Sequence, residues 1–256
     1  MNPAYKKHKP TLPKNRLIIG RKPLIEALQN GTSIEKIFIL KSASGDELYT
    51  IKDAARKQDI AISYVPPEKL SRFTQANHQG VVAIAGLISF QPLQEVISQT
   101  VDQGITPLLL ILDGITDTRN LGAMARAAHC YGAHALVVPA TNNAAITEEA
   151  VKTSAGALES LPICRVASVE EAISIAQLNG IQVIATTLDA HTLITEVDFK
   201  LPTAIVMGSE DKGVSNLVLK HADHLAKIPM SGNFESLNVA VATGVVLYEV
   251  HRQNNI

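Results

Sequence analysis

The chain has 256 residues, enough for one large α/β domain or two modest ones. Hydrophobic residues make up 46% and charged residues 18%, which excludes a disordered chain, and no apolar run is long enough for a membrane helix. Aromatic residues are only 4% and tryptophan is absent, so we expect an aliphatic core.

Charge is distributed unevenly along the chain. Residues 1–89 contain 14 Lys and Arg against 7 Asp and Glu, a net of +7, whereas residues 90–256 contain 9 against 17, a net of −8. A basic amino-terminal third favours contact with a polyanion, with nucleic acid as the first candidate, and a solvated tail is the alternative. The two cysteines, Cys130 and Cys164, match no disulfide or metal pattern and favour a reducing, cytoplasmic setting.

The amino-terminal third is predicted to hold an arm and a small domain. Residues 1–16 carry prolines among lysines with no apolar run behind them, so we expect a disordered basic arm and no signal peptide. Residues 17–89 predict a small α/β domain with helices near 24–28 and 46–58 and strands at 34–40, 60–65 and 80–87. Residues 90–106, with scattered Gln, Pro and Gly, predict a linker that holds a short helix at 93–101.

The remaining residues, 107–256, alternate between strand and helix patterns. The apolar run 107–113 ends in an acid, which is the profile of a central parallel strand. Further strands are predicted at 135–138, 163–166, 181–186, 203–207 and 225–228, with helices at 121–131, 147–158, 169–178, 214–221 and 237–251. Such repeated β–α units predict a parallel sheet covered on both faces.

Three polar segments follow apolar strands, where ligand sites of open α/β sheets lie. In residues 113–126, Asn120 is a candidate helix N-cap, and we expect Arg126 to face the strand end together with Asn120; an ordinary solvated arginine is the alternative. Residues 204–214 carry two glycines and the acids Glu210 and Asp211, but neither a dinucleotide fingerprint nor a phosphate-loop lysine pattern. A solvated turn is the alternative there.

The third segment, residues 228–244, leads into the last helix. Ser236 is the candidate N-cap, and the exposed N–H groups of the first turn would suit an anionic or carboxylate-bearing ligand. The helix predicted at 237–251 is apolar on more than one stripe, which predicts burial in the core or against another subunit.

Taken together and in this order, the three segments resemble the SpoU (TrmH) family of RNA ribose 2′-O-methyltransferases, in the SPOUT superfamily. The residues that carry the resemblance are Asn120-Leu121-Gly122-Ala123 with Arg126, Met207-Gly208-Ser209-Glu210 with Gly213, and Ser236-Leu237-Asn238-Val239-Ala240-Val241. The stretches 20–28 and 78–83 also resemble the start and the last strand of the family's accessory domain. The likeness covers residues 17–252 and is greatest to bacterial enzymes that methylate guanosine in 23S ribosomal RNA.

The resemblance implies an α/β SPOUT catalytic domain at 107–256, with a parallel sheet and a carboxyl-terminal trefoil knot. It implies an amino-terminal RNA-binding domain similar to ribosomal-protein folds, and a homodimer joined through the catalytic domain. The methyl donor would be S-adenosyl-L-methionine, held around Gly208, Ile228 and Leu237, with no metal. Thr118 departs from the family pattern, which often has proline, as do Val214-Ser215, where many relatives have Met-Arg.

The catalytic residues implied by the resemblance are Asn120, Arg126, Glu210, Ser236 and Asn238. Because arginine stays protonated, we expect Arg126 to clamp an RNA phosphate and to stabilise charge on the reacting oxygen. Glu210 would hold Arg126 in place or accept the proton. The alternatives are methylation of tRNA by the same chemistry and a non-catalytic RNA-binding protein; the missing glycine fingerprint argues against a nicotinamide-dependent oxidoreductase.

Overall fold

The computed structural model describes residues 16–255 apart from 59, 141 and 232–235, and it divides into two compact units between Gly86 and Leu87. Of the predicted arm, residues 1–15 lie outside the described residues. Arg16 belongs to the folded first unit, because its guanidinium donates to the Ala85 carbonyl at 2.7 and 2.9 Å and pairs with Glu35 at 2.6 Å. Within the described part of the chain, every helix is too short or too polar to cross a bilayer.

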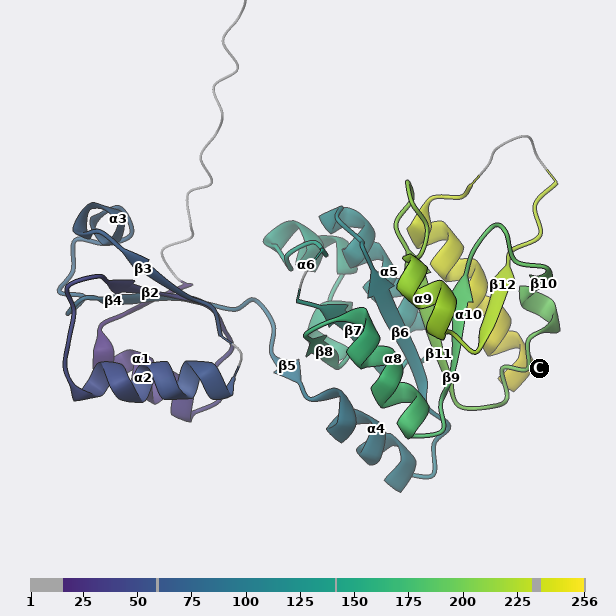
Figure 1. The fold of residues 1–256 in the computed structure, drawn as a ribbon, viewed down its shortest axis with the longest axis horizontal. Helices are drawn as coiled ribbons and strands as arrows, with labels where there is room; N and C mark the ends of the chain where they lie inside the picture. Colours follow the sequence, from purple (N-terminus) through teal and green to yellow (C-terminus); the bar gives the residue numbers. More distant parts are fainter. Residues whose placement is uncertain (1–15, 59, 141, 232–235, 256) are drawn as a thin grey trace, which may run out of the picture. The chain divides into compact units, whose positions relative to one another are not determined.

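The first unit is a four-stranded sheet with the strand order β1-β4-β2-β3. Its elements are β1 (Leu17–Ile19), α1 (Arg21–Gln29), β2 (Ile34–Leu40), α2 (Asp46–Lys57), β3 (Ile62–Val65), α3 (Pro67–Ser71) and β4 (Val81–Ala85). Helices α1 and α2 cover one face of the sheet and α3 lies on the other (Figure 1). The sequence did not indicate β1, which is very short, or α3, whose first residue Pro67 resembles a strand terminator but is well suited to a first helical turn.

The second unit contains an eight-stranded sheet among its described residues, in the order β10-β12-β9-β11-β6-β7-β8-β5, and all of its strand pairs are parallel. The strands are β5 (Phe90–Gln91), β6 (Leu108–Asp113), β7 (Ala135–Pro139), β8 (Ile163–Val166), β9 (Gln182–Thr186), β10 (Thr192–Leu193), β11 (Thr203–Gly208) and β12 (His224–Lys227). The parallel α/β fold predicted from the sequence is therefore confirmed, whereas the trefoil knot stays a prediction.

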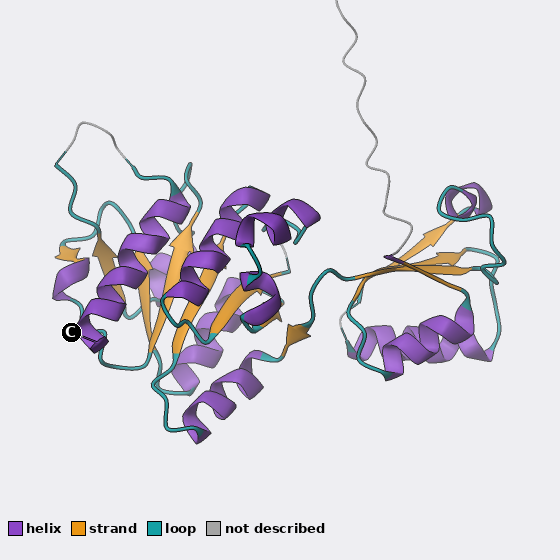
Figure 2. Cartoon of the chain, turned by 180° about the vertical axis from the view of Figure 1, so that it is seen from behind, coloured by secondary structure: helices purple, strands orange, loops and turns teal. Residues whose placement is uncertain are grey.

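Helices cover both faces of this sheet (Figure 2). They are α4 (Leu93–Asp102), α5 (Thr118–Cys130), α6 (Glu148–Ser154), α7 (Ala157–Ser160), α8 (Val169–Leu178), α9 (Asn216–His221) and α10 (Val239–Asn255), with a short 3₁₀ turn, η2 (Ile194–Glu196). Helices α4, α8 and α9 pack on one face, and α5, α6, α7 and α10 on the other. The helix predicted at 147–158 is split, because Ala155 adopts the left-handed conformation at the end of α6.

Residues 90–106, expected as a linker, are part of the second unit. Strand β5 pairs with β8, and α4 buries Leu93, Val96 and Ile97 against the sheet. These apolar positions recur at helical spacing, so burial of one face holds the segment to the sheet. The division between the units accordingly precedes Leu87.

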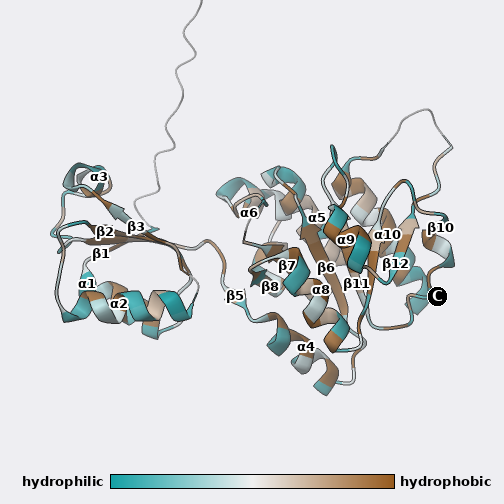
Figure 3. Cartoon of the chain, in the orientation of Figure 1, coloured by the Kyte–Doolittle hydropathy of each residue, from teal (hydrophilic) through white to brown (hydrophobic). Residues whose placement is uncertain are grey.

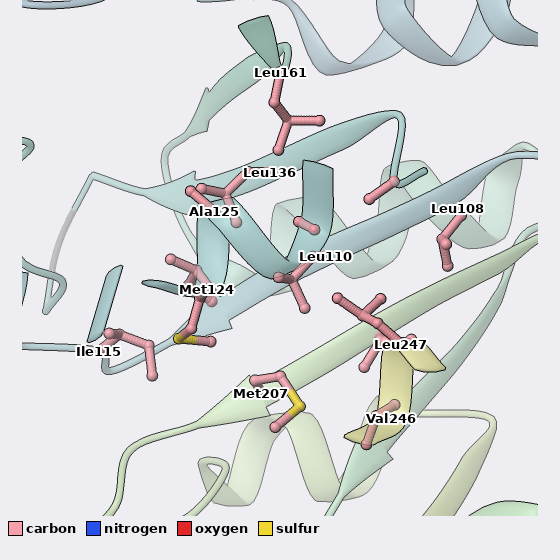
Figure 4. Close-up of a cluster of buried hydrophobic side chains, with 14 of the residues drawn as sticks. Leu108, Leu110, Ile115, Met124, Ala125, Leu136, Leu161, Met207, Val246 and Leu247 are labelled. Carbon is pink, nitrogen blue, oxygen red and sulfur yellow. The ribbon is translucent and has the colours of Figure 1, made fainter. Parts of the chain in front are cut away.

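The core of the second unit is aliphatic, as its composition predicts. The strands of the large sheet are mostly hydrophobic along their length (Figure 3). Figure 4 shows Leu110 of β6, Met124 of α5, Met207 of β11 and Leu247 of α10 in one buried cluster. This cluster fixes the starts of α5 and α10 relative to the ends of β6 and β11, which is where the polar segments lie.

Candidate active site

The ends of β6 and β11 form one edge of the large sheet. The two strands are parallel neighbours, with Gly208 opposite Asp113 in the register. The Asp113 carboxylate accepts a hydrogen bond from the Ser215 backbone N–H at 2.6 Å, which ties the loop after β11 to the end of β6. The first two polar segments of the sequence therefore lie together, at the edge where open parallel sheets bind ligands.

Helix α5 is capped by Asp117 and not, as the sequence led us to expect, by Asn120. The Asp117 carboxylate accepts from the backbone N–H groups of Arg119 at 2.7 Å and Asn120 at 3.3 Å. The helix therefore begins three residues earlier than predicted. Because Asp117 satisfies the first N–H groups, the amide side chain of Asn120 is available for contacts outside the helix.

Helix α10 is capped by Asn238 and not by Ser236. The Asn238 side-chain oxygen accepts from the backbone N–H groups of Ala240 at 3.1 Å and Val241 at 3.2 Å. Ser236 is exposed and lies before the helix. Part of the predicted third segment, residues 232–235, lies outside the described residues.

Three of the predicted site residues, Asn120, Glu210 and Asn238, form one hydrogen-bonded group, here called the amide–carboxylate cluster. Asn120 Nδ2 donates to Glu210 Oε1 at 3.0 Å, and Asn238 Nδ2 donates both to Asn120 Oδ1 at 3.0 Å and to Glu210 Oε1. The same Glu210 oxygen accepts from the Val239 backbone N–H at 3.1 Å. One carboxylate oxygen thus joins the starts of two helices to the loop after β11, through charge-assisted bonds.

Arg126 lies apart from this cluster. It is exposed, and among the described residues no hydrogen bond or ion pair engages its guanidinium. Six residues of α-helix correspond to a rotation of about 240°, so Arg126 and Asn120 project from different sides of α5. No hydrogen bond joins Arg126 to Asn120 or Glu210 among the described residues, and Glu210 bonds the two asparagines. That Arg126 and Asn120 act together stays a prediction.

Arg119 is a polar residue near the site that sequence reasoning missed. Its guanidinium pairs with Glu149 of α6 at 2.6 Å, and this hydrogen bond raises the pKa of Arg119. The Thr118 hydroxyl also donates to Glu149, at 3.4 Å. Thr118 is the first residue of α5, a position that proline also tolerates, so this departure from the family pattern leaves the helix start intact.

Ser215, the other departure, has a structural role at the start of α9. Its hydroxyl accepts from the Val218 backbone N–H at 3.4 Å and caps that helix. Val214 beside it is buried. Neither substitution touches the amide–carboxylate cluster.

A cavity of about 360 Å³ opens beside the cluster, between the ends of the parallel strands. Gly208, Ile228 and Leu237, the residues expected to hold the cofactor, all line it. Glu210 and Ser236 line it as well. The three residues predicted to hold the cofactor therefore line one cavity, along with two of the predicted catalytic residues.

One wall of this cavity was not predicted. Residues 186–189, Thr-Thr-Leu-Asp, begin at the last residue of β9 and line the cavity as well. The rule that placed the other three segments, polar residues after an apolar strand, applies equally to β9 and could have found this wall.

The loop after β11 returns so closely to Gly208 that the chain itself requires glycine at this position. A Cβ atom at this position would lie 2.0 Å from the Gly213 carbonyl carbon and 2.1 Å from the Val214 nitrogen. Ser209 and Gly213 exchange two backbone hydrogen bonds, of 2.8 and 3.0 Å, which fold the loop back over Gly208. A side chain at position 208 would therefore displace this loop.

The lining suits a cofactor with an apolar planar part and polar ends. Leu188, Met207, Ile228 and Leu237 supply apolar surface, and Asp189 and Asp211 supply carboxylates. The volume lies within the usual range for small-molecule sites.

No group of three or more His, Cys, Asp or Glu residues in the described part of the chain is placed to hold a metal ion.

Fold and site together define a parallel α/β protein with a ligand cavity at the carboxyl edge of its sheet, bordered by a fixed carboxylate and amides. Residues 107–248 match the model of the SpoU rRNA Methylase family, and residues 17–90 match the model named RNA 2′-O ribose methyltransferase substrate binding. The chain belongs to the SpoU (TrmH) family of RNA methyltransferases.

Individual relatives agree with this assignment. YacO of Bacillus subtilis, assigned to the TrmH family of tRNA/rRNA methyltransferases, is 34% identical over 238 residues, covering 93% of this chain and 96% of YacO. The SpoU methyltransferase AviRb of Streptomyces viridochromogenes, solved with the cofactor AdoMet, has a TM-score of 0.60 at 25% identity, covering 93% of this chain and 90% of AviRb. An AdoMet-bound rRNA methyltransferase of Sinorhizobium meliloti has a TM-score of 0.58 at 27% identity, covering 93% and 88%.

Proposed function

We propose that this protein transfers the methyl group of S-adenosyl-L-methionine to a ribose 2′-hydroxyl of RNA, at a guanosine of 23S ribosomal RNA. The observation that carries the proposal is the amide–carboxylate cluster of Asn120, Glu210 and Asn238 beside the cavity lined by Gly208, Ile228 and Leu237. The AdoMet complexes of two structural relatives support the choice of cofactor.

The cofactor supplies an electrophilic methyl group, so the protein has to hold the hydroxyl in line with it and ease loss of the proton. Asn120 and Asn238 present amide groups whose orientation is fixed by Glu210. Glu210 Oε1 accepts three N–H bonds and so positions the two asparagines. The Glu210 carboxylate is also the proposed acceptor of the hydroxyl proton when the methyl group passes from the sulfonium to the oxygen. Ser236, exposed on the cavity wall, can bond the ribose or the cofactor.

Arg126 contributes an exposed cation with no partner among the described residues. A guanidinium of this kind binds a phosphate in bidentate geometry, and it stabilises negative charge that develops on a nearby oxygen. Arg126 lies apart from the amide–carboxylate cluster. One RNA strand could contact both Arg126 and the cluster, or Arg126 could act at the cluster of a second subunit.

A homodimer joined through the second unit fits the surface of α10. Val241, Val245 and Tyr248 are 54%, 38% and 49% exposed and follow one another at helical spacing, so they form an apolar stripe. Burial of such a stripe in an isologous contact removes it from water. We include this dimer, and the SPOUT knot, in the proposal.

The substrate class is supported by the first unit. Residues 17–90 match a substrate-binding model, and residues 1–89 carry a net charge of +7. We assign residues 17–89 to RNA binding, with the basic residues 1–16 adding to the attraction, and residues 107–256 to catalysis. Ribosomal RNA is the preferred substrate, and tRNA is the alternative that the experiment separates.

The test is methyl transfer to RNA from cells that lack the gene. Purified protein, labelled S-adenosyl-L-methionine and separated 23S, 16S and transfer RNA fractions show which fraction accepts the label, and mapping of 2′-O-methyl positions identifies the nucleotide. We expect label at one guanosine of 23S RNA and none with Asn120→Ala. Label in tRNA alone would replace the substrate assignment, and absence of transfer to any RNA would refute the activity.

A further inference from the structure

The first unit exposes two tyrosine rings. Tyr49 on α2 is 78% exposed and Tyr64 on β3 is 52% exposed. The other described aromatic rings of this unit, Phe38 and Phe73, lie against each other with ring centroids 4.8 Å apart, over the opposite face of the sheet. Among the described Phe and Tyr residues of this unit, the two tyrosines are therefore the exposed ones.

Lys52 lies over the ring of one tyrosine and three residues after the other on α2. Its Nζ lies 5.3 Å from the centroid of the Tyr64 ring, and it follows Tyr49 by three residues on α2, which places both on the same side of the helix. No carboxylate pairs with Lys52 in the described part of the chain. By contrast, the neighbouring Arg56 and Lys57 share Asp53, at 3.2 and 2.8 Å.

The position of Tyr64 makes it accessible to an extended ligand. Strand β3 is at the edge of the small sheet, because the order is β1-β4-β2-β3. Tyr64 is next to the last residue of this strand, and the following Val65 accepts a backbone bond at 3.1 Å from exposed Lys41. The backbone of a second basic residue is therefore held beside the end of the strand.

We propose that Tyr49, Lys52 and Tyr64 form a stacking platform that binds unpaired RNA bases, so that the first unit selects a single-stranded segment of the substrate RNA. This inference rests on the proposed function, and it adds that the recognised RNA is single-stranded. Aromatic rings stack on any base whose faces are free, and a lysine between them bonds the adjacent phosphate. In a duplex the base faces are covered, so the same rings have nothing to stack on.

The charge of the unit favours RNA over a protein partner. Residues 1–89 carry a net of +7, of which residues 16–89, with 10 Lys and Arg against 7 Asp and Glu, contribute +3. The platform presents two rings with a lysine that no carboxylate among the described residues pairs, rather than a continuous apolar surface. Lys36 over Phe38 and Lys69 over Phe73, both at 5.6 Å, form similar cation–ring contacts on the other face, but those rings are largely covered. That face supplies a matched control.

The experiment uses tyrosine fluorescence of the full chain. The protein has five tyrosines and no tryptophan, so quenching by a stacked base is not masked. A short oligouridine and a hairpin of equal length are titrated separately. We expect the oligouridine to quench and to bind more tightly than the hairpin, and Tyr64→Leu and Tyr49→Leu each to weaken its binding at least about fivefold.

Matched variants separate stacking from charge. Tyr64→Phe keeps the ring and should bind like wild type. The slope of log affinity against log salt concentration counts the phosphate contacts. Lys52→Gln should reduce the magnitude of this slope by about one, whereas Tyr64→Leu should leave the slope unchanged. Lys36→Gln, on the covered face, should lose less affinity than Lys52→Gln.

Unchanged affinity and quenching in both leucine variants would overturn the platform, as would equal binding of hairpin and oligouridine. Methyl transfer to the natural RNA gives an independent readout. Tyr64→Leu should raise KM for RNA and leave kcat at saturating RNA unchanged. If the wild-type protein transfers no methyl group but still shows ring-dependent binding of oligouridine, then the proposed function fails and the platform stands.

Discussion

The side chains of Asn120 and Asn238 are hydrogen-bonded to each other at 3.0 Å, although 118 positions separate them in the sequence. Both also donate to Glu210 Oε1. Asn238 uses its amide in two directions, since its oxygen caps α10 and its nitrogen bonds the cluster. The start of α10 and the geometry of the site therefore depend on the same side chain.

Asn238→Asp separates these two roles. The carboxylate can still cap α10, but it lacks the Nδ2 donor and brings a second negative charge beside Glu210. We expect methyl transfer to be lost while the helix start is kept. Asn238→Ala removes the cap as well, at a further cost of about 1 kcal/mol in unfolding free energy. Denaturant unfolding and methyl-transfer rates of the two variants test this, and equal activity of Asn238→Asp and wild type would contradict it.

Glu210→Gln tests whether the cluster acts as a unit. The substituted amide can accept hydrogen bonds with one atom only, and it no longer gives charge-assisted bonds to Asn120 and Asn238. In a double-mutant cycle with Asn120→Ala, we expect a coupling free energy of about 0.5–3 kcal/mol, measured by unfolding. Additive effects would show that Glu210 and Asn120 contribute independently.

The sequence predicts the order of most elements because apolar periodicity is a local property. The helix caps were harder to assign, since each helix start offers two suitable residues. Asn120 and Ser236 are both good capping residues, but Asp117 and Asn238 have that role. For α5, the Asn120 side-chain amide donates to Glu210, which lies 90 positions away in the sequence. The amide is therefore engaged outside the helix, and Asp117 caps α5 instead.

Two other features depend on tertiary geometry. The need for glycine at 208 arises from the close return of residues 213 and 214, which no local pattern reveals. The platform residues Tyr49 and Tyr64 come from a helix and a strand, and only the fold brings Lys52 over the Tyr64 ring. The family resemblance identified the residues of the amide–carboxylate cluster, but not which of them bond one another.

The two thiols should differ in reactivity. Cys130 is exposed, whereas burial raises the pKa of the Cys164 thiol to about 12. Because the thiolate is the reactive form, a disulfide reagent at neutral pH should modify Cys130 in the native protein and Cys164 only after unfolding. Mass spectrometry of the labelled peptides tests this. Rapid native labelling of Cys164 would show that its surroundings open readily.

His134 should make stability depend on pH. Burial lowers the pKa of its imidazole, and neutral Nδ1 accepts from the Leu108 backbone N–H at 3.0 Å. A histidine whose pKa is lowered on folding binds more protons when unfolded, so its contribution is fully present above the unfolded pKa of about 6.5 and declines as pH falls below it. His134→Gln keeps an acceptor without the titration, so its unfolding free energy should change less between about pH 7 and 5. Parallel pH curves for both proteins would exclude this histidine as the cause.

Substitution of Arg126 tests whether this residue has a structural role or takes part in the reaction. Since it is exposed and unpaired among the described residues, Arg126→Ala should alter unfolding free energy by no more than about 0.5 kcal/mol. Affinity for S-adenosyl-L-methionine should also stay unchanged, because Arg126 does not line the cavity.

The rate of methyl transfer should nevertheless fall strongly in Arg126→Ala, if its cation stabilises the transition state. Arg126→Lys keeps the charge but loses the planar fork, so we expect it to restore little. Arg119→Ala on the same helix is the matched control, because that arginine is already paired with Glu149. Single-turnover rates at saturating RNA and cofactor decide between the roles. A wild-type rate in Arg126→Ala would leave this residue a solvated helix side chain, whereas a loss of rate in Arg126→Ala and not in Arg119→Ala would give Arg126 a role in the reaction.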